Sequence, residues 1–441
     1  MTNVFRFSTF SVSALAGAVM LASGSAMAAG LTLNEQSASS AGMAYAGRGS
    51  SALDASTVFG NPAGMSKLDG THMTLGTAFI DASVDIKNAS SVAAYPDPAD
   101  PLNNPPILVP RTGSSKGDMT PGTAVPFAYY TDQINDRWHV GFGVFASLGG
   151  KADYERNFIG RYKGDKTEVQ VITFQPTLSY RIADNLSVGG GVTVNRIEGE
   201  LNTQLHFAPN MPDGHFNTKG SDTALGYNLG VLWDVVDGTS VGLTYRSKVK
   251  YKLHGTANVN AIDAATGAPV VGSFRGGLDF TQPEAVEASL SQAITNELTL
   301  HAGAVWTRWS ELQEIRIETS GVPASLASRG EPTEWRDQWA FALGGSYQLT
   351  PTVVLRAGFA LDESPATNEH RSVRVPYGNR KVGTLGVGWQ ATQNLGFDFA
   401  YGYLKESDAA VNQAPDVGRP GFSATYKNSA NIFAAQLNYK F

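Results

Sequence analysis

The sequence of 441 residues contains no cysteine, and only 16% of its residues carry a charge. A lack of cysteine fits the cell envelope, where free thiols would be oxidised. The formal net charge of -6 argues against nucleic acid as a partner. Beyond the N-terminal leader, no run of about 18 apolar residues occurs, which excludes a helical membrane protein.

Motifs of catalysis and metal binding are also missing. The chain has neither an H-E-x-x-H zinc motif nor a G-x-x-x-x-G-K-[ST] phosphate loop. Its histidines lack metal-ligand spacing, so residues such as His139 and His301 are interpreted as polar residues of the fold. We therefore expect no enzymatic activity, no cofactor and no metal site. A barrel-borne lipase with a Ser–His pair is the alternative.

The first 28 residues have the three parts of a signal peptide. Arg6 is the positive flank, residues 12–22 are the apolar core, and Ala26-Met27-Ala28 matches an A-x-A cleavage site. The mature chain is predicted to begin at Ala29. A single membrane anchor is the alternative reading, but the apolar core is too short to cross about 30 Å of hydrocarbon.

Apolar residues occupy every second position over long stretches of the remaining chain. In residues 433–441, Phe433, Leu437 and Phe441 share one face, whereas Gln436 and Lys440 share the other. The same period recurs in residues 241–245, 298–306, 385–389 and 395–403. The opposite faces are rich in glycine and polar residues, which suits an aqueous lumen better than a second packed sheet.

Aromatic residues gather near the ends of these stretches, where a membrane barrel places its interfacial girdles; examples are Trp138, Trp306 and Trp339. Short turns alternate with long polar segments, as in barrels with short periplasmic turns and long external loops. We therefore predict an all-β protein, a transmembrane antiparallel β-barrel of about 14 strands over residues 69–441. A soluble β-sandwich is the alternative. Long external loops are predicted at about residues 83–121, 149–166, 204–220, 256–274, 319–333 and 406–427.

Residues 29–68 differ from the rest because they show neither a helical nor a strand period and are crowded with glycine, alanine and serine. A compact segment of small residues ahead of a long all-β chain is predicted to lie inside the barrel as a hatch, or plug. A general diffusion porin, the main rival reading of the strands, has no reason for such a segment. Energy-coupled transporters have plugs, but their barrels have about 22 strands.

Several motifs resemble the FadL-type outer-membrane transporters, which carry long-chain fatty acids and other hydrophobic compounds. They are Leu33-Asn34-Glu35, Ala44-Tyr45-Ala46-Gly47 and Asn61-Pro62-Ala63 in the hatch. The aromatic end at Phe441 resembles the terminal signature of outer-membrane barrels. The resemblance implies a monomer in the outer membrane of a Gram-negative bacterium. It also implies contacts with outer-membrane lipid, lipopolysaccharide and, through the C-terminal strand, the barrel-assembly machinery.

The same resemblance implies passive uptake of hydrophobic compounds, most simply long-chain fatty acids. The ligand would be captured outside, bound in an interior pocket and released laterally through the barrel wall. A water-filled vertical route would be unfavourable, because exposing apolar surface costs about 25 cal/mol per Å². Uptake of neutral or aromatic hydrocarbons on the same fold, or general diffusion through a porin, is the alternative function.

Residues 149–166 mix aromatic with charged side chains and resemble the third external loop of the family. In the family this loop carries an apolar groove that first captures the ligand. A short amphipathic helix packed on the barrel rim is the alternative for this segment. The predicted groove residues are Tyr154, Phe158, Ile159 and Tyr162.

Family members with a known interior site use two basic side chains near the hatch to receive the carboxylate of a fatty acid. The resemblance places one of them within residues 325–337, where Arg329 is the first candidate and Arg336 the second. The other falls near Thr203, where this sequence has no Arg or Lys.

A further group of cations alternates along one stretch, so we expect their side chains on one face of a strand. A cationic ladder in the lumen would hold a carboxylate, pair with nearby acids, or contact lipopolysaccharide where the strand emerges. These residues are Arg246, Lys248, Lys250 and Lys252.

The tripeptide Asn61-Pro62-Ala63 is predicted to be a rigid turn, because Pro62 fixes its own φ and keeps Asn61 out of the helical region. In the family this turn approaches an inward kink of a barrel strand that opens a gap in the wall. By resemblance, Gly141 and Gly143 mark the kinked strand here. Glycine at these positions also fits simple crowding against the hatch.

Overall fold

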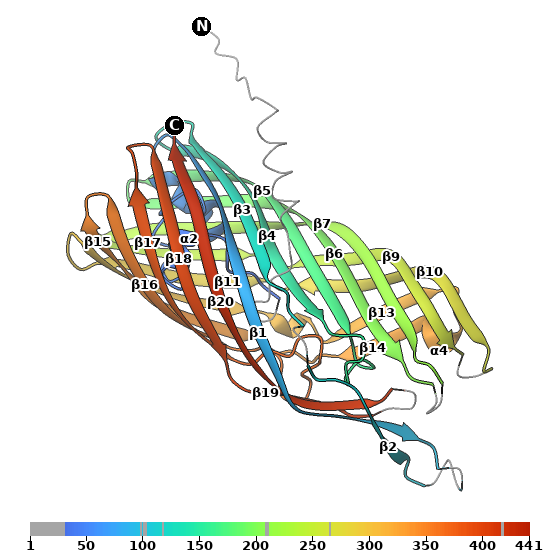
Figure 1. Ribbon diagram of the computed structural model, residues 1–441. Helices are drawn as coiled ribbons and strands as arrows, with labels where there is room; N and C mark the ends of the chain where they lie inside the picture. Colours follow the sequence, from blue (N-terminus) through green and yellow to red (C-terminus); the bar gives the residue numbers. More distant parts are fainter. Residues whose placement is uncertain are drawn as a thin grey trace.

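The computed structural model describes residues 31–97, 99, 104–116, 119–207, 211–263, 266–415 and 419–441. The predicted signal peptide of residues 1–28 and the predicted mature start at Ala29 lie outside this part. The described chain forms a closed antiparallel β-barrel of 14 strands, which confirms the predicted fold class (Figure 1). Among the described residues, no helix is both long and apolar enough to cross a membrane.

The strands follow one another around the ring in chain order, and the ring closes where β1 pairs with β20. Four ring positions consist of two strand segments separated by an irregular stretch. In order, the positions are β1 (Thr71–Tyr95), β3 (Thr123–Gln133), β4 (Trp138–Asp153), β5 (Lys166–Ala183), β6 (Leu186–Leu205), β7 (Gly214–Val236), β8 (Thr239–Arg246) with β9 (Val249–Ile262), β10 (Pro269–Gln282) with β11 (Ala285–Ala293), β12 (Leu298–Thr307) with β13 (Glu314–Ser320), β14 (Ser328–Pro332) with β15 (Gln338–Thr350), β16 (Val353–Asp362), β17 (Arg380–Gln390), β18 (Leu395–Glu406) and β20 (Gly421–Lys440).

The strands point their large apolar side chains away from the lumen. On β18, Phe399 and Tyr401 are 49% and 41% exposed, whereas their neighbour Asp398 is only 5% exposed. Leu343 and Leu385 on nearby strands are exposed in the same way. An apolar outer face and a polar inner face are what a strand that crosses a bilayer requires, and they reverse the arrangement of a soluble sandwich.

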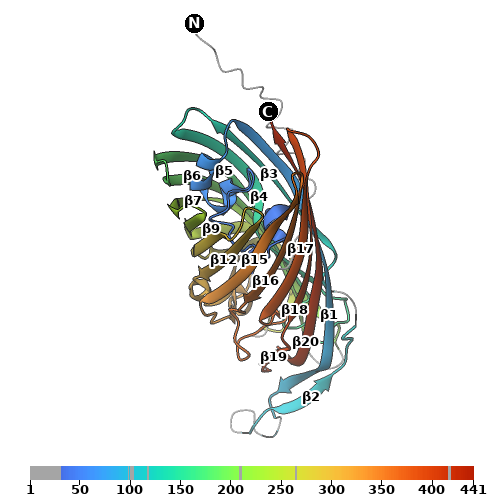
Figure 2. The same ribbon diagram turned by 90° about the vertical axis from the view of Figure 1, so that its left-hand side faces the viewer.

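The two ends of the barrel differ. Short turns follow β3, β5, β7, β15 and β17, and the C-terminus lies at the same end (Figure 1). The other end carries the long connections, including α4 (Ala324–Ala327), β2 (Ile107–Arg111) and β19 (Ala409–Gln413), whereas η2 (Trp309–Glu311) lies in the irregular stretch between β12 and β13. Figures 1 and 2 show the hairpin of β1 and β2 projecting beyond the ring at this end.

Much of the sequence expected to form loops at this end is strand instead. β1 continues to Tyr95, while β6 pairs with β7 as far as Leu205 and Gly214, and β9 pairs with β10 as far as Ile262 and Pro269. The reason is that each extension satisfies its backbone N–H and C=O groups on a neighbouring strand, as β1 does on β20 as far as Val92. Apolar and polar side chains alternate less regularly in these extensions than in the membrane-crossing part, but the pattern still supports the hydrogen-bonded strand pairs.

Residues 31–68, the N-terminal segment, lie within the ring, and Figure 2 shows their helices enclosed by strands. The segment contains α2 (Ala38–Ala41), α3 (Thr57–Gly60) and η1 (Pro62–Lys67). α2 contacts β17, β18 and β20, whereas η1 contacts β4 to β7 on the opposite part of the ring. Small residues permit this fit: a Cβ on Gly386 of β17 would lie 2.7 Å from the Cα of Gly42.

Candidate functional site

The Asn61-Pro62-Ala63 tripeptide is a rigid turn at the start of η1, as its sequence predicts. The Asn61 side chain accepts a hydrogen bond from the Ala63 amide at 3.1 Å, and it donates to the carbonyls of Gly49 at 2.7 Å and Val231 at 2.9 Å. The turn packs on Gly189 of β6, where a Cβ would lie 2.5 Å from the carbonyl carbon of Pro62. Asn61 therefore ties the turn both to the rest of the N-terminal segment and to β7.

The barrel wall has a seam between β3 and β4. Their ladder ends at the pair Phe127 and Phe145, and beyond it β4 pairs only with β5, with an irregularity between Ala146 and Leu148. The N-terminal segment occupies the freed edge of β4. The Gly149 amide donates to the Leu31 carbonyl at 2.8 Å, and the amide of Leu33 reaches the carbonyl of Ser147 at 3.4 Å. The seam is thus covered from inside by the start of the N-terminal segment.

Gly141 and Gly143 lie on the predicted strand but outside its irregularity. Both are in the regular ladder, paired with Thr131 and Tyr129 of β3. A Cβ on Gly141 would lie 2.5 Å from the sulfur of Met65 in η1, so this glycine makes room for the N-terminal segment. The break in the wall comes after them, where Phe145 ends the ladder, because beyond it the N-terminal segment replaces β3 as the partner of β4.

Of the four residues predicted for the capture groove, Tyr154, Phe158 and Ile159 belong to one apolar cluster at the long-connection end, in turns rather than in a helix. The ring of Tyr162 packs on His206 instead. Tyr154 and Phe158 stack with ring centroids 3.9 Å apart, and Phe158 packs on Phe422 of β20. Phe158, Ile159 and Tyr162 are buried, and the hydroxyl of Tyr162 donates to Asp213 at 2.8 Å. Tyr154, Phe158 and Ile159 are therefore packed against other apolar residues rather than lining an open trough.

An apolar cavity lies between the N-terminal segment and the parts of β5, β6, β7, β9, β10 and β13 towards the long connections. It holds about 650 Å³ of empty space, part of it open to solvent. Leu31 of the N-terminal segment closes one side, and Val375 of the connection between β16 and β17 closes another. Barrel residues complete the wall, among them Ile197, Leu253, Phe280 and Ile315, while Glu168 and Lys219 lie at its margin.

Arg329, the first headgroup candidate, lies near this cavity on β14. Its guanidinium carbon is 5.4 Å from the ring centre of Phe216, and the part of the chain that the structure describes contains no ion pair to it. Burial, and then the neighbouring Arg419 and Arg374, lower the pKa of Arg329 to about 10. The group is still a cation at neutral pH, and within the described residues no carboxylate pairs with it.

Arg336, the second candidate, is exposed on the connection before β15. No hydrogen bond or ion pair within the described residues joins it to Arg329. Thr203, the position without a basic residue, nevertheless receives a cation: Nη2 of Arg374 donates to the Thr203 hydroxyl at 2.5 Å. Arg374 comes from a distant part of the chain, so only the tertiary structure reveals this contact.

The expected ladder of four cations does not lie on one face. Residues 247 and 248 interrupt the strand between β8 and β9, and the phase of the side chains changes there. Arg246 faces the lumen, where it pairs with Glu287 at 3.3 Å and donates to the Phe59 carbonyl. Lys250 and Lys252 point outward, because the alternate residues of β9 are buried in the lumen. The alternation rule requires an unbroken strand, which is absent here.

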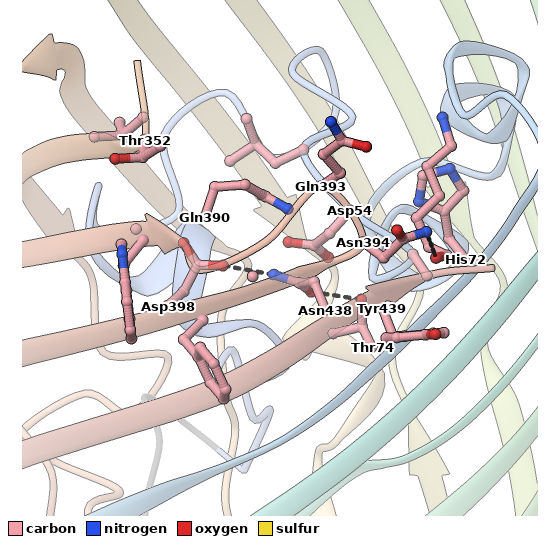
Figure 3. A pocket seen from close by; sticks show the side chains of 18 of the residues that line it. Asp54, His72, Thr74, Thr352, Gln390, Gln393, Asn394, Asp398, Asn438 and Tyr439 are labelled. Atoms are coloured by element: carbon pink, nitrogen blue, oxygen red, sulfur yellow. Dashed lines mark hydrogen bonds between the residues drawn. The ribbon is translucent and has the colours of Figure 1, made fainter. Parts of the chain in front are cut away.

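A polar cavity opens at the short-turn end, on the other side of the N-terminal segment. It holds about 1050 Å³, including open solvent, and Asp54 lines it together with residues of β1, β16, β18 and β20. Figure 3 shows Asp398 and Asn438 facing it, and the Asn438 amide donates to Asp398 at 2.7 Å. Asp398 also pairs with Arg356 at 2.6 Å. Such a wall holds water well and an alkyl chain poorly.

Sequence reasoning missed Leu31, Arg374 and Val375 as residues of the apolar cavity and its margin. The sequence does carry a signal for them, because the cation Arg374 is followed by the β-branched Val375 in a segment where polar and apolar residues alternate. The segment lies between two strands, however, and nothing in its own pattern shows that it folds back into the mouth of the barrel.

Comparison with known proteins shows similarity over the whole chain. The family model described as outer membrane protein transport protein (OMPP1/FadL/TodX) matches residues 19–441. Outer membrane protein P1 of Haemophilus influenzae is 28% identical, over 98% of this chain and 99% of that protein. The long-chain fatty acid transport protein of Escherichia coli is also 28% identical, again over 98% of this chain and 99% of its own length.

Solved structures share the fold. A FadL homologue from Pseudomonas aeruginosa superposes with a TM-score of 0.83 at 23% identity, over 94% of this chain and 100% of that chain. The Pseudomonas putida toluene transporter TodX superposes with a TM-score of 0.65 at 15% identity, over 91% of this chain and 97% of that chain.

Proposed function

The chain belongs to the outer membrane protein transport family (OMPP1/FadL/TodX), and from this premise we propose that it takes up long-chain fatty acids by passive diffusion. It is an outer-membrane protein of a Gram-negative bacterium, as its relatives are, and a transporter of hydrophobic compounds. The family consists of transport channels rather than enzymes. Membership of the family does not specify which chemical class of compound is transported, so we argue that class from the residues of the site.

The observation that carries the proposal is the apolar cavity with a partly buried, unpaired cation near it. An alkyl chain buried among Leu253, Phe280 and Val375 gains about 25 cal/mol per Å² of apolar surface removed from water. A carboxylate gains in addition from Arg329, which has no counter-ion in the described chain. A neutral hydrocarbon would gain only the first of these terms, so the site fits an amphiphile with an anionic head.

The route that we propose runs from the mouth to the apolar cavity and then sideways through the seam between β3 and β4. Tyr154, Phe158, Ile159 and Tyr162 would capture the ligand at the mouth once their packed cluster loosens. The N-terminal segment would act as the hatch, with Asn61-Pro62-Ala63 as its hinge to the wall. Withdrawal of Leu31 from β4 would expose the seam to the bilayer.

A general diffusion porin fits these residues less well, because the N-terminal segment contacts opposite parts of the ring. We further propose a monomer whose C-terminal strand, ending at the exposed Phe441, is recognised by the barrel-assembly machinery. Lys250 and Lys252 on the outer face would contact lipopolysaccharide.

The test is uptake of labelled oleate and of labelled toluene by cells that lack their own fatty-acid porter, with and without this protein. We expect oleate uptake, and we expect Arg329→Gln to lower it at least about fivefold while toluene uptake stays unchanged. Arg316→Gln is the matched control, because Arg316 is on the adjacent strand β13, 53% exposed and already paired with Glu314.

Uptake of toluene without oleate would contradict the fatty-acid proposal and leave the family assignment intact. Equal effects of Arg329→Gln and Arg316→Gln would show that the hairpin of β13 and β14, rather than its cation, matters for uptake.

A further inference from the structure

We propose that the barrel wall has a second gap, between β10 and β13, and that this gap is a side entrance to the apolar cavity. Hydrophobic compounds dissolved in the outer leaflet of the membrane enter through it, in addition to those captured at the mouth, and Trp309 closes it. The inference rests on the proposed function in one respect, namely that the apolar cavity receives the transported compound. It holds equally for a compound with a charged head and for a neutral one.

The gap is an interruption of the strand ladder. Towards the short turns, β11 pairs with β12, and the last pair is Ala285 with Thr307. Towards the long connections, β10 pairs with β13, and the first pair is Leu278 with Ile317. β10 continues through the interruption but pairs there only with β9. Among the described residues, no ladder therefore joins the two stretches of wall between these pairs.

The apolar cavity lies against this gap. Phe280 and Ile315 both line the cavity, and they come from the two stretches that no ladder joins. Gly277 and Leu278, next to the gap on β10, line it as well. Side chains rather than a continuous sheet therefore separate the cavity from the outer surface here. The seam between β3 and β4 is a different break, because β5, β6, β7 and β9 lie between the two around the ring.

A row of residues on the outer face shows the height of the gap in the membrane. Register partners on four neighbouring ring positions form this row, and three of the four are aromatic: Tyr245, Val286, Trp306 and Trp339. Aromatic girdles mark the interface between hydrocarbon and headgroups. The ladder ends one residue beyond the row, at Ala285. The gap therefore opens at the outer interface, where water and headgroups can bond the unpaired backbone groups.

Ion pairs on the outer surface agree with this height. Arg308 pairs with Glu284 at 3.0 Å, from one side of the gap to the other, and Lys248 pairs with Glu311 at 3.1 Å. Arg308 is 46% exposed. Exposed charged side chains are costly in hydrocarbon but are readily solvated among headgroups. The edge of the gap towards the short turns thus lies where the apolar outer face of the barrel ends.

Trp309 is placed to close the gap. It is 0% exposed in η2, and it belongs to the same apolar cluster as Phe280 and Leu253 of the cavity wall. Among the described residues, no acceptor bonds its buried indole N–H. A buried donor without a partner destabilises the closed position of the ring. Tryptophan is favoured at a membrane interface, where its N–H reaches water, so an open position outside the gap compensates for the lost packing.

The physical advantage of a side entrance is that the compound stays out of water. A hydrophobic compound partitions into the membrane, and a route through the mouth would require it to return to water before capture. That return is unfavourable in proportion to the apolar surface exposed. A gap at the interface leads from the outer leaflet to Phe280 and Ile315 without this step.

Trp309 could instead only fill the core of the wall. The two roles make different predictions. A core residue loses packing in every smaller variant, so uptake falls or stays constant in all of them. A door responds in opposite directions to a variant that opens the gap and to one that makes the closed position more stable.

The experiment measures initial rates of uptake of labelled oleate and labelled toluene by cells that lack their own fatty-acid porter. The probe is whichever compound the unaltered protein takes up. We expect Trp309→Ala, which opens the gap, to raise the rate at least about threefold. Trp309→Phe keeps a ring in the gap and removes the unpaired N–H, so it should lower the rate about twofold. Trp339→Phe is the matched control, because Trp339 is 44% exposed on the outer face, and it should leave the rate unchanged.

A block from outside tests the gap independently of Trp309. The chain has no cysteine, so a single introduced cysteine can be labelled with a bulky maleimide. Asp279→Cys places the label at an exposed position beside the gap, and we expect the label to lower uptake at least about threefold. Lys381→Cys is the control, because Lys381 is exposed on a strand that is paired on both sides. If Trp309→Ala fails to form a folded barrel, judged by heat-modifiable mobility, Trp309→Phe and the label carry the test.

A fall in uptake in both Trp309 variants, or no change in either, would overturn the inference and leave a core residue. A label at Asp279→Cys that has no more effect than the label at Lys381→Cys would overturn it as well. The proposed function stands in both cases, because the unaltered protein still takes up its compound. An unaltered protein that takes up neither oleate nor toluene would overturn the proposed function itself, and the inference with it.

Discussion

The two cavities on either side of the N-terminal segment have opposite chemistry. The cavity towards the long connections is lined by Ile197, Leu253 and Phe280 and has cations near its margin. The cavity at the short-turn end is lined by Asp54, Asp398 and Asn438 and is open to solvent. Since short turns face the periplasm in bacterial barrels, the apolar cavity is on the side from which the ligand comes.

This difference makes a straight path along the barrel axis energetically unfavourable for a hydrophobic ligand. An alkyl chain that left the apolar cavity for the polar one would lose about 25 cal/mol for each Å² that it exposed to water. The seam between β3 and β4 offers an alternative, because the start of the N-terminal segment, Leu31 to Leu33 with the side chain of Gln36, covers it from inside and could withdraw. The contrast between the cavities is therefore a physical argument for lateral release.

The largest expected effect comes from placing a charge in each cavity in turn. Leu253→Glu puts a carboxylate among apolar side chains. Burying that charge without a partner costs roughly several kcal/mol, unless water enters the cavity to solvate it. We expect at least about a tenfold fall in oleate uptake. Val354→Glu makes a similar change in the polar cavity and should leave uptake within about twofold, because water solvates the new charge.

Both variants should reach the outer membrane as folded barrels, checked by heat-modifiable mobility. Equal falls in uptake would mean that both cavities lie on the ligand's path, which would break the comparison.

A smaller effect is expected from two asparagines, Asn61 at the start of η1 and Asn438 of β20 in the wall of the polar cavity. Asn61→Ala removes bonds to Gly49 and Val231, each worth about 1 kcal/mol, and so loosens the hinge of the hatch. We expect oleate uptake to fall about three- to fivefold with the barrel still assembled. Asn438→Ala removes bonds in the polar cavity only, and uptake should not change.

Deletion of the hatch should also alter uptake without preventing assembly. Uptake that stays the same after both the Asn61 change and the deletion would rule out a hinge at this turn.

The smallest expected effect is on the pH dependence of binding. The pKa of Arg329 is lowered to about 10, so the group is protonated at neutral pH and loses its proton as the pH rises through that value. Oleate affinity should therefore be constant from about pH 7 to 9 and fall about threefold by pH 11. Oleyl alcohol should show no such fall, and a matching fall for both ligands would point to unfolding.

Sequence patterns alone predict most of the architecture. The period-two alternation of β18 and β20 requires only that each strand be unbroken, so the membrane-crossing part of the barrel and its strand count follow from local rules. The small residues of the N-terminal segment likewise predict a lumenal position. The alternation rule fails between Arg246 and Lys250, because the strand is interrupted at residues 247 and 248 and the side chains on the two sides of the break point to different faces.

The sequence alone determined the barrel and the turn at Asn61. Only the tertiary structure decided that Leu31 caps the edge of β4, that Phe158 is packed rather than open, and that Arg374 reaches Thr203. The physical reason is the range of the interactions. A strand is specified by neighbours two residues apart, whereas a cavity is specified by side chains that meet only after the ring has closed.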